Sequence, residues 1–178
     1  MNIKWDQIKT YLIDIGSLKK PRDIVRLFKE NNIDFYLYEI VHLGQQGKPT
    51  FTVKYGMSAD NSRDFGDRAY RQIAHCTSWG KQRIKGNSGA DFFVTEHEIK
   101  SQYGIDLDHK LLRLRIWDMT GYQFDTIDYY EEINKIEGYF IDQYKKVYGR
   151  KPIGNLNDEH NALFRPSIRK ATFNSLFV

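Results

Sequence analysis

Apolar residues recur every three or four positions in two segments near the start of the chain, residues 3–15 and residues 21–32. This spacing places the apolar side chains on one face of an α-helix, and Pro21 has a favourable position in a first helical turn. The pattern therefore predicts two amphipathic helices. We assign residues 1–33 to an N-terminal helical extension.

The pattern changes in the next segment, IDFYLYEIVHL (residues 33–43), which is rich in aromatic and β-branched side chains. The turn sequence GQQGKP follows, and the run TFTVKYG (residues 50–56) has the composition of a returning strand. Aromatic and β-branched residues favour strands, whereas glycine and proline favour the loop between them. Residues 34–56 are therefore predicted to form an antiparallel hairpin with a long loop.

Three further elements follow the hairpin. The segment FGDRAYRQIAH (residues 65–75) has helical spacing and places Arg71 and His75 four positions apart on one face. The alternating run KLLRLRIWDM (residues 110–119) predicts a third strand, and residues 126–149 predict a long amphipathic helix that ends in a glycine. The predicted fold class is α/β (α+β), with a small, mostly antiparallel central sheet of three strands flanked by helices.

Residues 77–110 have the least regular pattern, with several glycines around a short apolar run. We interpret this segment as a recognition insertion within a core domain of residues 34–157. Residues 158–178 change from polar to apolar, and we expect this C-terminal tail to dock on the core.

The chain has 178 residues, which fits one domain of ordinary size with its own hydrophobic core. Its single cysteine, Cys76, excludes an intramolecular disulfide and a cysteine-rich zinc cluster. The first residues lack the apolar region of a secretion signal, and no apolar run approaches the length of about 18 residues that a membrane span needs. We expect a cytoplasmic protein with no membrane partner.

Lysine and arginine outnumber aspartate and glutamate by 27 to 23, and the sequence pI is about 9.0. This excess is mild, and the distribution of charge is more informative. Basic residues concentrate in residues 63–85, whereas residues 118–142 are acidic. Such asymmetry suits a surface that holds phosphates beside a carboxylate that binds a metal ion. The basic residues are Arg63, Arg68, Arg71, Lys81, Arg83 and Lys85.

The chain presents its chemical groups in a definite order. A tyrosine on one strand is followed by a glycine at the end of the returning strand, an arginine and a histidine on a helix, a third strand, a glutamate on a second helix, and an asparagine in a turn. These residues are Tyr38, Gly56, Arg71, His75, Glu137 and Asn155. The order resembles that of the GIY-YIG nuclease family and covers residues 34–157.

The two half-motifs of that family correspond to Tyr36-Leu37-Tyr38 and Lys54-Tyr55-Gly56 in this chain. Tyr36 and Leu37 replace the glycine and isoleucine of the first half-motif, and Lys54 replaces the leading tyrosine of the second. These replacements support an alternative interpretation, in which the same scaffold is a catalytically inactive nucleic-acid-binding module.

The resemblance implies a metal-dependent DNA endonuclease that hydrolyses phosphodiester bonds. It implies Glu137 as the ligand of one Mg²⁺ or Mn²⁺, Arg71 on the scissile phosphate, and Tyr38 as the residue that activates water. Lys54 is expected to assist by lowering the pKa of the Tyr38 phenol, because an unperturbed tyrosine, with a pKa of about 10, is a poor base at neutral pH. His75, one turn from Arg71, is the alternative proton acceptor.

Further residues are expected to contact the substrate, which the resemblance implies is double-stranded DNA cut in a site-specific, restriction-type manner. Gly56 would leave room for a phosphate, and Asn155 is expected to order the turn beneath the site. A homodimer is the simplest assembly that cuts both strands with one site per chain. The expected substrate-binding residues are Gly56, Arg63, Arg68, Lys81, Arg83, Lys85 and Asn155.

A second nuclease pattern lies in residues 91–100. Asp91, Glu98 and Lys100 satisfy a loose Asp…Glu-x-Lys arrangement, in which two acids bind a metal ion and a lysine assists the water. The pattern is short, and the intervening residues leave little room for the hairpin that it needs, so we rank it second. The sequence has no Walker loop, dinucleotide-binding glycine loop or zinc-ligand spacing, which argues against NTPase, dehydrogenase and zinc-finger functions.

Overall fold

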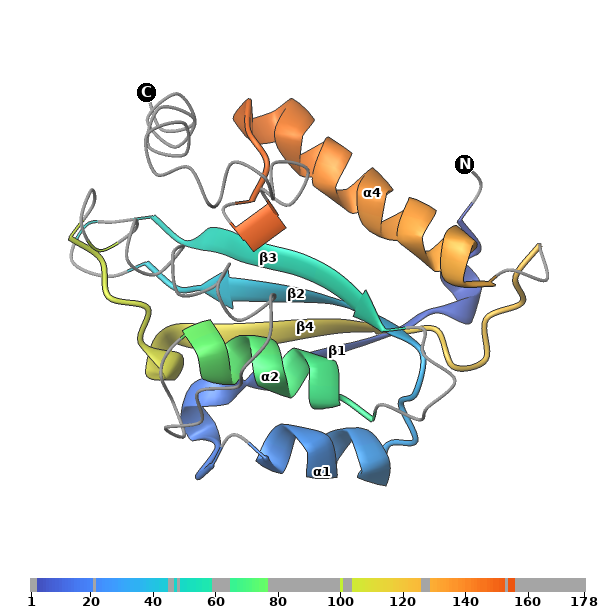
Figure 1. Ribbon diagram of the computed structural model, residues 1–178, viewed down its shortest axis with the longest axis horizontal. Helices are drawn as coiled ribbons and strands as arrows, with labels where there is room; N and C mark the ends of the chain where they lie inside the picture. The colour runs from blue at the N-terminus through green and yellow to red at the C-terminus, as the bar shows by residue number, and fades with distance from the viewer. Residues whose placement is uncertain are drawn as a thin grey trace.

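The described part of the chain folds as a four-stranded sheet with helices on both faces (Figure 1). The computed structural model describes residues 3–20, 22–44, 47, 49–58, 65–76, 100, 104–125, 129–152 and 154–155, with the side chains of all of these except residues 74–76. The strands within these residues are β1 (Lys9–Asp14), β2 (Tyr36–His42), β3 (Phe51–Ser58) and β4 (Leu112–Asp118). The α-helices are α1 (Asp23–Glu30), α2 (Asp67–Cys76) and α4 (Tyr129–Tyr148). No helix in this part of the chain combines the length and the apolar character needed to cross a membrane.

The strands follow the order β1-β4-β2-β3, and each neighbouring pair is antiparallel. β2 and β3 form the predicted hairpin, with Tyr38 opposite Gly56 and Ile40 opposite Lys54. The register shifts between Ile40 and Val41, so β3 contains an additional residue beside Lys54. The predicted third strand is confirmed as β4, which lies between β1 and β2.

The predicted helix over residues 3–15 is wrong, because Lys9–Asp14 form strand β1 and extend the sheet to four strands rather than three. Burial alternates along β1: Tyr11 and Ile13 pack against the hydrophobic core, whereas Leu12 between them is exposed. This period of two competes with the helical spacing of the same residues. Pairing with β4 decides between the two patterns, because it satisfies the backbone hydrogen-bonding groups along the facing edges of the two strands.

Helices α1 and α2 cover one face of the sheet (Figure 1). The ring of Phe28 in α1 meets the ring of Tyr36 in β2 edge to face, with the ring centroids 4.8 Å apart. Ile73 of α2 is fully buried in the same core. Gly66, just before α2, lies so close to Phe28 that a Cβ would be 2.6 Å from its ring, which fixes the start of α2 against α1.

Helix α4 covers the opposite face. Its Ile133, Ile136 and Tyr144 are buried in one cluster with Leu37 of β2 and Trp117 of β4, which confirms the apolar stripe expected from the sequence. The helix also packs against β3. The edge strand β3 therefore has α2 on one face of the sheet and α4 on the other.

Candidate functional site

The candidate site lies at the β3 edge of the sheet, where charged side chains from the two faces interact electrostatically. Lys54 comes from β3, Arg68 comes from α2, and Glu137 comes from α4. The charges of Lys54 and Arg68 both act on the Glu137 carboxylate. We name these three residues the Glu137 cluster, and its assembly requires the sheet and both helical layers.

Lys54 is buried, although lysine is rarely found so far from solvent. Its Nζ donates a hydrogen bond to Oε1 of Gln72 on α2, at 3.3 Å. Its aliphatic stem lies against Gly154, where an added Cβ would be 2.8 Å from the Cβ of Lys54. Gln72 and Gly154 therefore hold this lysine in place, whereas a surface lysine would move among many rotamers.

Glu137 is half-buried on the side of α4 that approaches β3. Burial raises the pKa of Glu137, because the carboxylate loses solvating water, and the charges of Lys54 and Arg68 lower the pKa by a smaller amount. The side chain is thus a partly desolvated carboxylate whose charge is partly compensated by two cations.

Helix α2 presents its two arginines in different directions. Arg68 lowers the pKa of Glu137 through its charge, and Gln72, four positions later, accepts a hydrogen bond from Lys54. Arg71 forms an ion pair with Asp67, also four positions away, with 2.6 Å between Nη2 and Oδ2. Arg68, expected from the sequence to contact the substrate, therefore acts electrostatically on Glu137, whereas Arg71, which the resemblance places on the scissile phosphate, is paired with Asp67.

Tyr38 reaches toward β3 from the central strand β2. It is 1% exposed and lies directly opposite Gly56. A Cβ at Gly56 would overlap the phenol oxygen of Tyr38, so the absent side chain of Gly56 makes the space that this phenol occupies. The room that the sequence suggested for a phosphate is therefore filled by Tyr38, on the face of β3 that also carries Lys54.

Asn155 binds the outer edge of β3 through its side chain. The backbone N–H of Tyr55 donates to Oδ1 of Asn155 at 2.6 Å, and Nδ2 of Asn155 donates to the carbonyl oxygen of Tyr55 at 2.9 Å. Asn155 is buried, so water cannot easily replace these two bonds. The amide fixes the strand between Lys54 and Gly56 and is directed at protein backbone.

Tyr55 itself faces the opposite side of the sheet, as strand alternation predicts. Its hydroxyl donates a hydrogen bond to Oε1 of the buried Glu39 at 3.1 Å, and Arg115 pairs with the other oxygen of Glu39 at 2.8 Å. The pKa of Tyr55 is raised well above its usual range, first by burial and then by the charge of Glu39. Tyr55 therefore stays protonated at neutral pH and is unsuited to act as a base.

Several residues selected from the sequence lie outside the described residues: Arg63, Lys81, Arg83, Lys85, Asp91, Glu98 and the side chain of His75. The same holds for most of residues 77–110 and for the tail, residues 158–178. Lys100 is described, and its Nζ pairs with Oδ1 of Asp106 at 2.6 Å.

The donor set decides which metal ion Glu137 could hold. Within the described residues, no group of three or more His, Cys, Asp or Glu side chains is placed to hold a metal ion. Glu137 would therefore be a lone carboxylate ligand. Mg²⁺ fits such a ligand, because it keeps several waters and is commonly bound by one or two carboxylates together with substrate phosphates. A lone carboxylate could contribute one ligand to Mg²⁺ or Mn²⁺ if water and a phosphate supplied the others.

Comparisons of the chain with models of protein families, with curated proteins and with solved structures find no match.

Proposed function

We propose that the chain is a metal-dependent endonuclease that hydrolyses phosphodiester bonds in double-stranded DNA, in a site-specific, restriction-type manner. One observation carries the proposal: the half-buried carboxylate of Glu137 lies within the electrostatic influence of Lys54 and Arg68, two cations from two other elements. Phosphodiester hydrolysis requires an anchor for a metal ion, a fixed positive charge for the phosphate and a group that orients water. The Glu137 cluster supplies candidates for the first two requirements, and Tyr38, on the same face of β3 as Lys54, is the candidate for the third.

Arg68 is the arginine that we assign to the scissile phosphate, because its charge already lowers the pKa of Glu137. Arg71 is the alternative that the family resemblance implies. It would first have to exchange its ion pair with Asp67 for the phosphate. Both partners of that pair are partly exposed, and such pairs contribute only about 0–1 kcal/mol, so the exchange would cost little.

Tyr38 is assigned the role of orienting or activating the attacking water, with Lys54 stabilising negative charge on the phenol. His75, on the same helix as Arg68, is the alternative proton acceptor. Glu137 would hold the Mg²⁺ or Mn²⁺, which when bound supplies charge neutralisation at the phosphoryl oxygens. With one site per chain, cutting both strands of a duplex is simplest in a homodimer.

A second candidate function is a nucleic-acid-binding module without activity on the same scaffold. The buried Lys54 favours this alternative, because its ammonium group already donates a hydrogen bond to Gln72 and its charge lowers the pKa of Glu137. In this alternative the Glu137 cluster is a structural ion cluster, and buried lysines of that kind are stable when they are paired.

The deciding experiment incubates plasmid DNA with the protein and Mg²⁺ or Mn²⁺. Wild type and the control Glu131→Ala, which alters an exposed glutamate on the same helix, should cut equally, whereas Glu137→Ala should not cut. An uncut plasmid across many substrates, with duplex binding retained, would favour the binding module. Loss of cutting in Glu98→Ala, with Glu137→Ala still active, would instead move the site to residues 91–100.

A further inference from the structure

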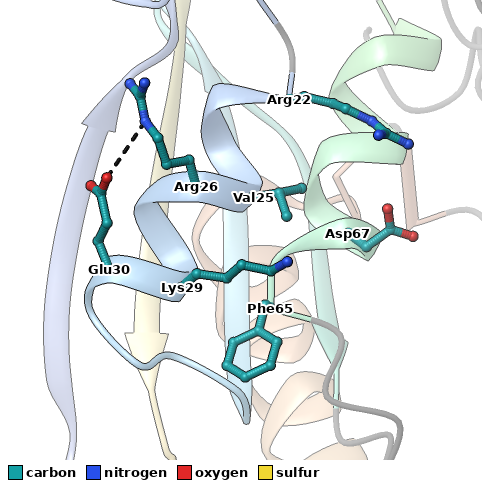
Figure 2. A pocket seen from close by; sticks show the side chains of 7 residues that line it. All are labelled: Arg22, Val25, Arg26, Lys29, Glu30, Phe65 and Asp67. Atoms are coloured by element: carbon teal, nitrogen blue, oxygen red, sulfur yellow. Dashed lines mark ion pairs between the residues drawn. The ribbon is translucent and has the colours of Figure 1, made fainter.

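A groove of about 660 Å³ separates α1 from the start of α2 (Figure 2). Its volume lies within the range of pockets that bind ligands. None of its lining residues belongs to the Glu137 cluster. The lining residues are Arg22, Val25, Arg26, Lys29, Glu30, Phe65 and Asp67.

The charges in this groove leave two cations available. Glu30 is paired with Arg26, with 3.6 Å between Nε and Oε1, and Asp67 is paired with Arg71. Within the described part of the chain, Arg22 and Lys29 form no ion pair, and both are exposed. The groove therefore has the charge of a binding surface for an anionic group.

The positions of the side chains suit an extended anion. Arg22, Val25 and Lys29 are spaced by three and four residues, so they share the face of α1 that looks toward α2. Figure 2 shows Arg22 and Lys29 extending on this side, with Val25 between them, while the pair of Arg26 and Glu30 lies on the other side. The two cations start about 10 Å apart along the helix axis, enough to contact separate phosphates.

Phe65 forms part of the apolar wall of the groove with an unusual backbone conformation. Its φ is 43°, a value that residues other than glycine seldom adopt, and Gly66 next to it has φ of 81°. Gly66 is pressed against the ring of Phe28, which holds this turn in place. The turn that carries Phe65 is therefore packed against α1 through Gly66.

The groove and the Glu137 cluster share the first turn of α2. Asp67 lines the groove, and Arg68 acts on Glu137. We propose that the groove holds the sugar–phosphate backbone of duplex DNA beside the cut position, with Arg22 and Lys29 on two phosphates and Val25 and Phe65 against the sugars. The inference rests on the proposed function for the identity of the occupant.

Equilibrium binding of a fluorescein-labelled DNA duplex, followed by anisotropy in EDTA so that no strand is cut, tests the groove separately from catalysis. The variant Arg22→Glu/Lys29→Glu should bind at least about tenfold more weakly than wild type, and its log affinity should fall with log salt by a slope smaller by about 2. The control Lys145→Ala/Lys146→Ala, which removes two exposed lysines at the end of α4, should keep the wild-type slope. Circular dichroism and thermal unfolding check that all three proteins are folded.

Equal affinity and equal salt slope in the groove variant and the control would overturn the groove inference, and so would a wild type that does not bind the duplex. The cutting assay distinguishes this failure from a failure of the proposed function. If wild type cuts DNA but the groove variant binds like the control, the proposed function stands and the groove inference fails. If the groove variant loses binding but wild type never cuts, the groove inference stands and the proposed function fails.

Discussion

The ammonium group of Lys54 on β3 lowers the pKa of the Glu137 carboxyl on α4, against the larger effect of burial, which raises it. The two side chains belong to different layers of the fold, and their charges interact because β3 is an edge strand beside which α4 packs. The charge state of Glu137 therefore depends on how α4 packs beside β3. A change in its pKa on folding can be measured through the pH dependence of the free energy of unfolding.

Glu137→Gln should make the protein more stable to unfolding at neutral pH. Because the pKa of Glu137 in the folded state lies above its ordinary value of 4.5, the folded state binds more protons than the unfolded state in this range. Stability is therefore lost as the pH rises from the ordinary pKa through the raised one, and glutamine removes this loss. Urea unfolding should show a larger gain from Glu137→Gln at neutral pH than at a pH below the ordinary pKa.

The exposed Glu131→Gln serves as the control for this measurement, since its carboxylate pairs with Lys135 at the surface. It should change stability by no more than about 0.5 kcal/mol at either pH. A gain from Glu137→Gln that is the same at both pH values would contradict the raised pKa.

Mg²⁺ should stabilise the wild-type protein more than Glu137→Gln when a short DNA duplex is present. A ligand that binds only the folded state adds about 1.4 kcal/mol to the free energy of unfolding at ten times its Kd. Glutamine keeps the size of the side chain but lacks the negative charge that a hard cation prefers. Thermal unfolding with and without Mg²⁺ measures the difference, and identical Mg²⁺ shifts for the two proteins would rule out Glu137 as the ligand.

Gly56→Ala should destabilise the protein by about 1–3 kcal/mol, the usual cost of overpacking a core. The new methyl group would overlap the phenol of Tyr38, and Tyr38 has no room to withdraw because it is fully buried in β2. The same change in a Tyr38→Ala background should cost much less, because the obstructing ring is absent. Chemical denaturation of the four proteins of this cycle provides the test.

Gly138→Ala provides a matched control for Gly56→Ala. Gly138 lies within α4, and open space surrounds the position of an added Cβ. Alanine should therefore stabilise the helix by about 0.5–1 kcal/mol, the opposite sign from Gly56. A similar loss at both positions would mean that the overlap with Tyr38 does not determine the cost.

The hairpin, β4, α2 and α4 could be predicted because local patterns determine them. In the hairpin, aromatic strands flank a glycine and proline loop, and in α4 the apolar residues return at helical spacing over five turns. Strand β1 could not be predicted in this way. The segment from Ile8 to Ile15 satisfies both helical and strand spacing, and only the edge of β4, formed about a hundred residues later, selects the strand.

The sequence places Arg68 and Arg71 on different sides of α2. Ala69 and Ile73 form its buried stripe, so Arg68 lies beside the stripe and Arg71 lies on the opposite side. This geometry can be read from the sequence, and it favours Arg68 as the arginine on the side of the sheet. The resemblance instead implies Arg71, because Arg71 and His75 lie four positions apart. The convergence of Lys54 and Glu137 needed the three-dimensional packing of α4, which no local pattern contains.

Arg68→Ala should reduce DNA cleavage by about 10²–10³-fold, the usual effect of removing a positive or hydrogen-bonding group that stabilises the transition state. Arg71→Ala should reduce it far less, because the guanidinium of Arg71 is paired with Asp67. Single-turnover rates at saturating protein separate this loss from weaker binding. A large loss in Arg71→Ala with a small one in Arg68→Ala would return the phosphate to Arg71.

Asn155→Ala should lower both the stability and the activity of the protein. It removes both hydrogen bonds to the backbone of Tyr55 and leaves a buried N–H and a buried carbonyl without these partners, at a cost of about 1–3 kcal/mol for each group that water cannot reach. Asn134→Ala is the matched control, because Asn134 is exposed on α4, and it should change stability by no more than about 0.5 kcal/mol.

The effect of Asn155 on activity should follow from its position on the strand rather than from contact with DNA. Tyr55 lies between Lys54 and Gly56, so a loosened strand displaces the lysine of the Glu137 cluster and the glycine that accommodates Tyr38. Single-turnover cleavage should therefore fall in Asn155→Ala, while duplex affinity in EDTA stays close to that of wild type. Weaker duplex binding with an unchanged rate at saturation would instead assign Asn155 to the substrate, because a group that only positions β3 has no reason to alter affinity for DNA.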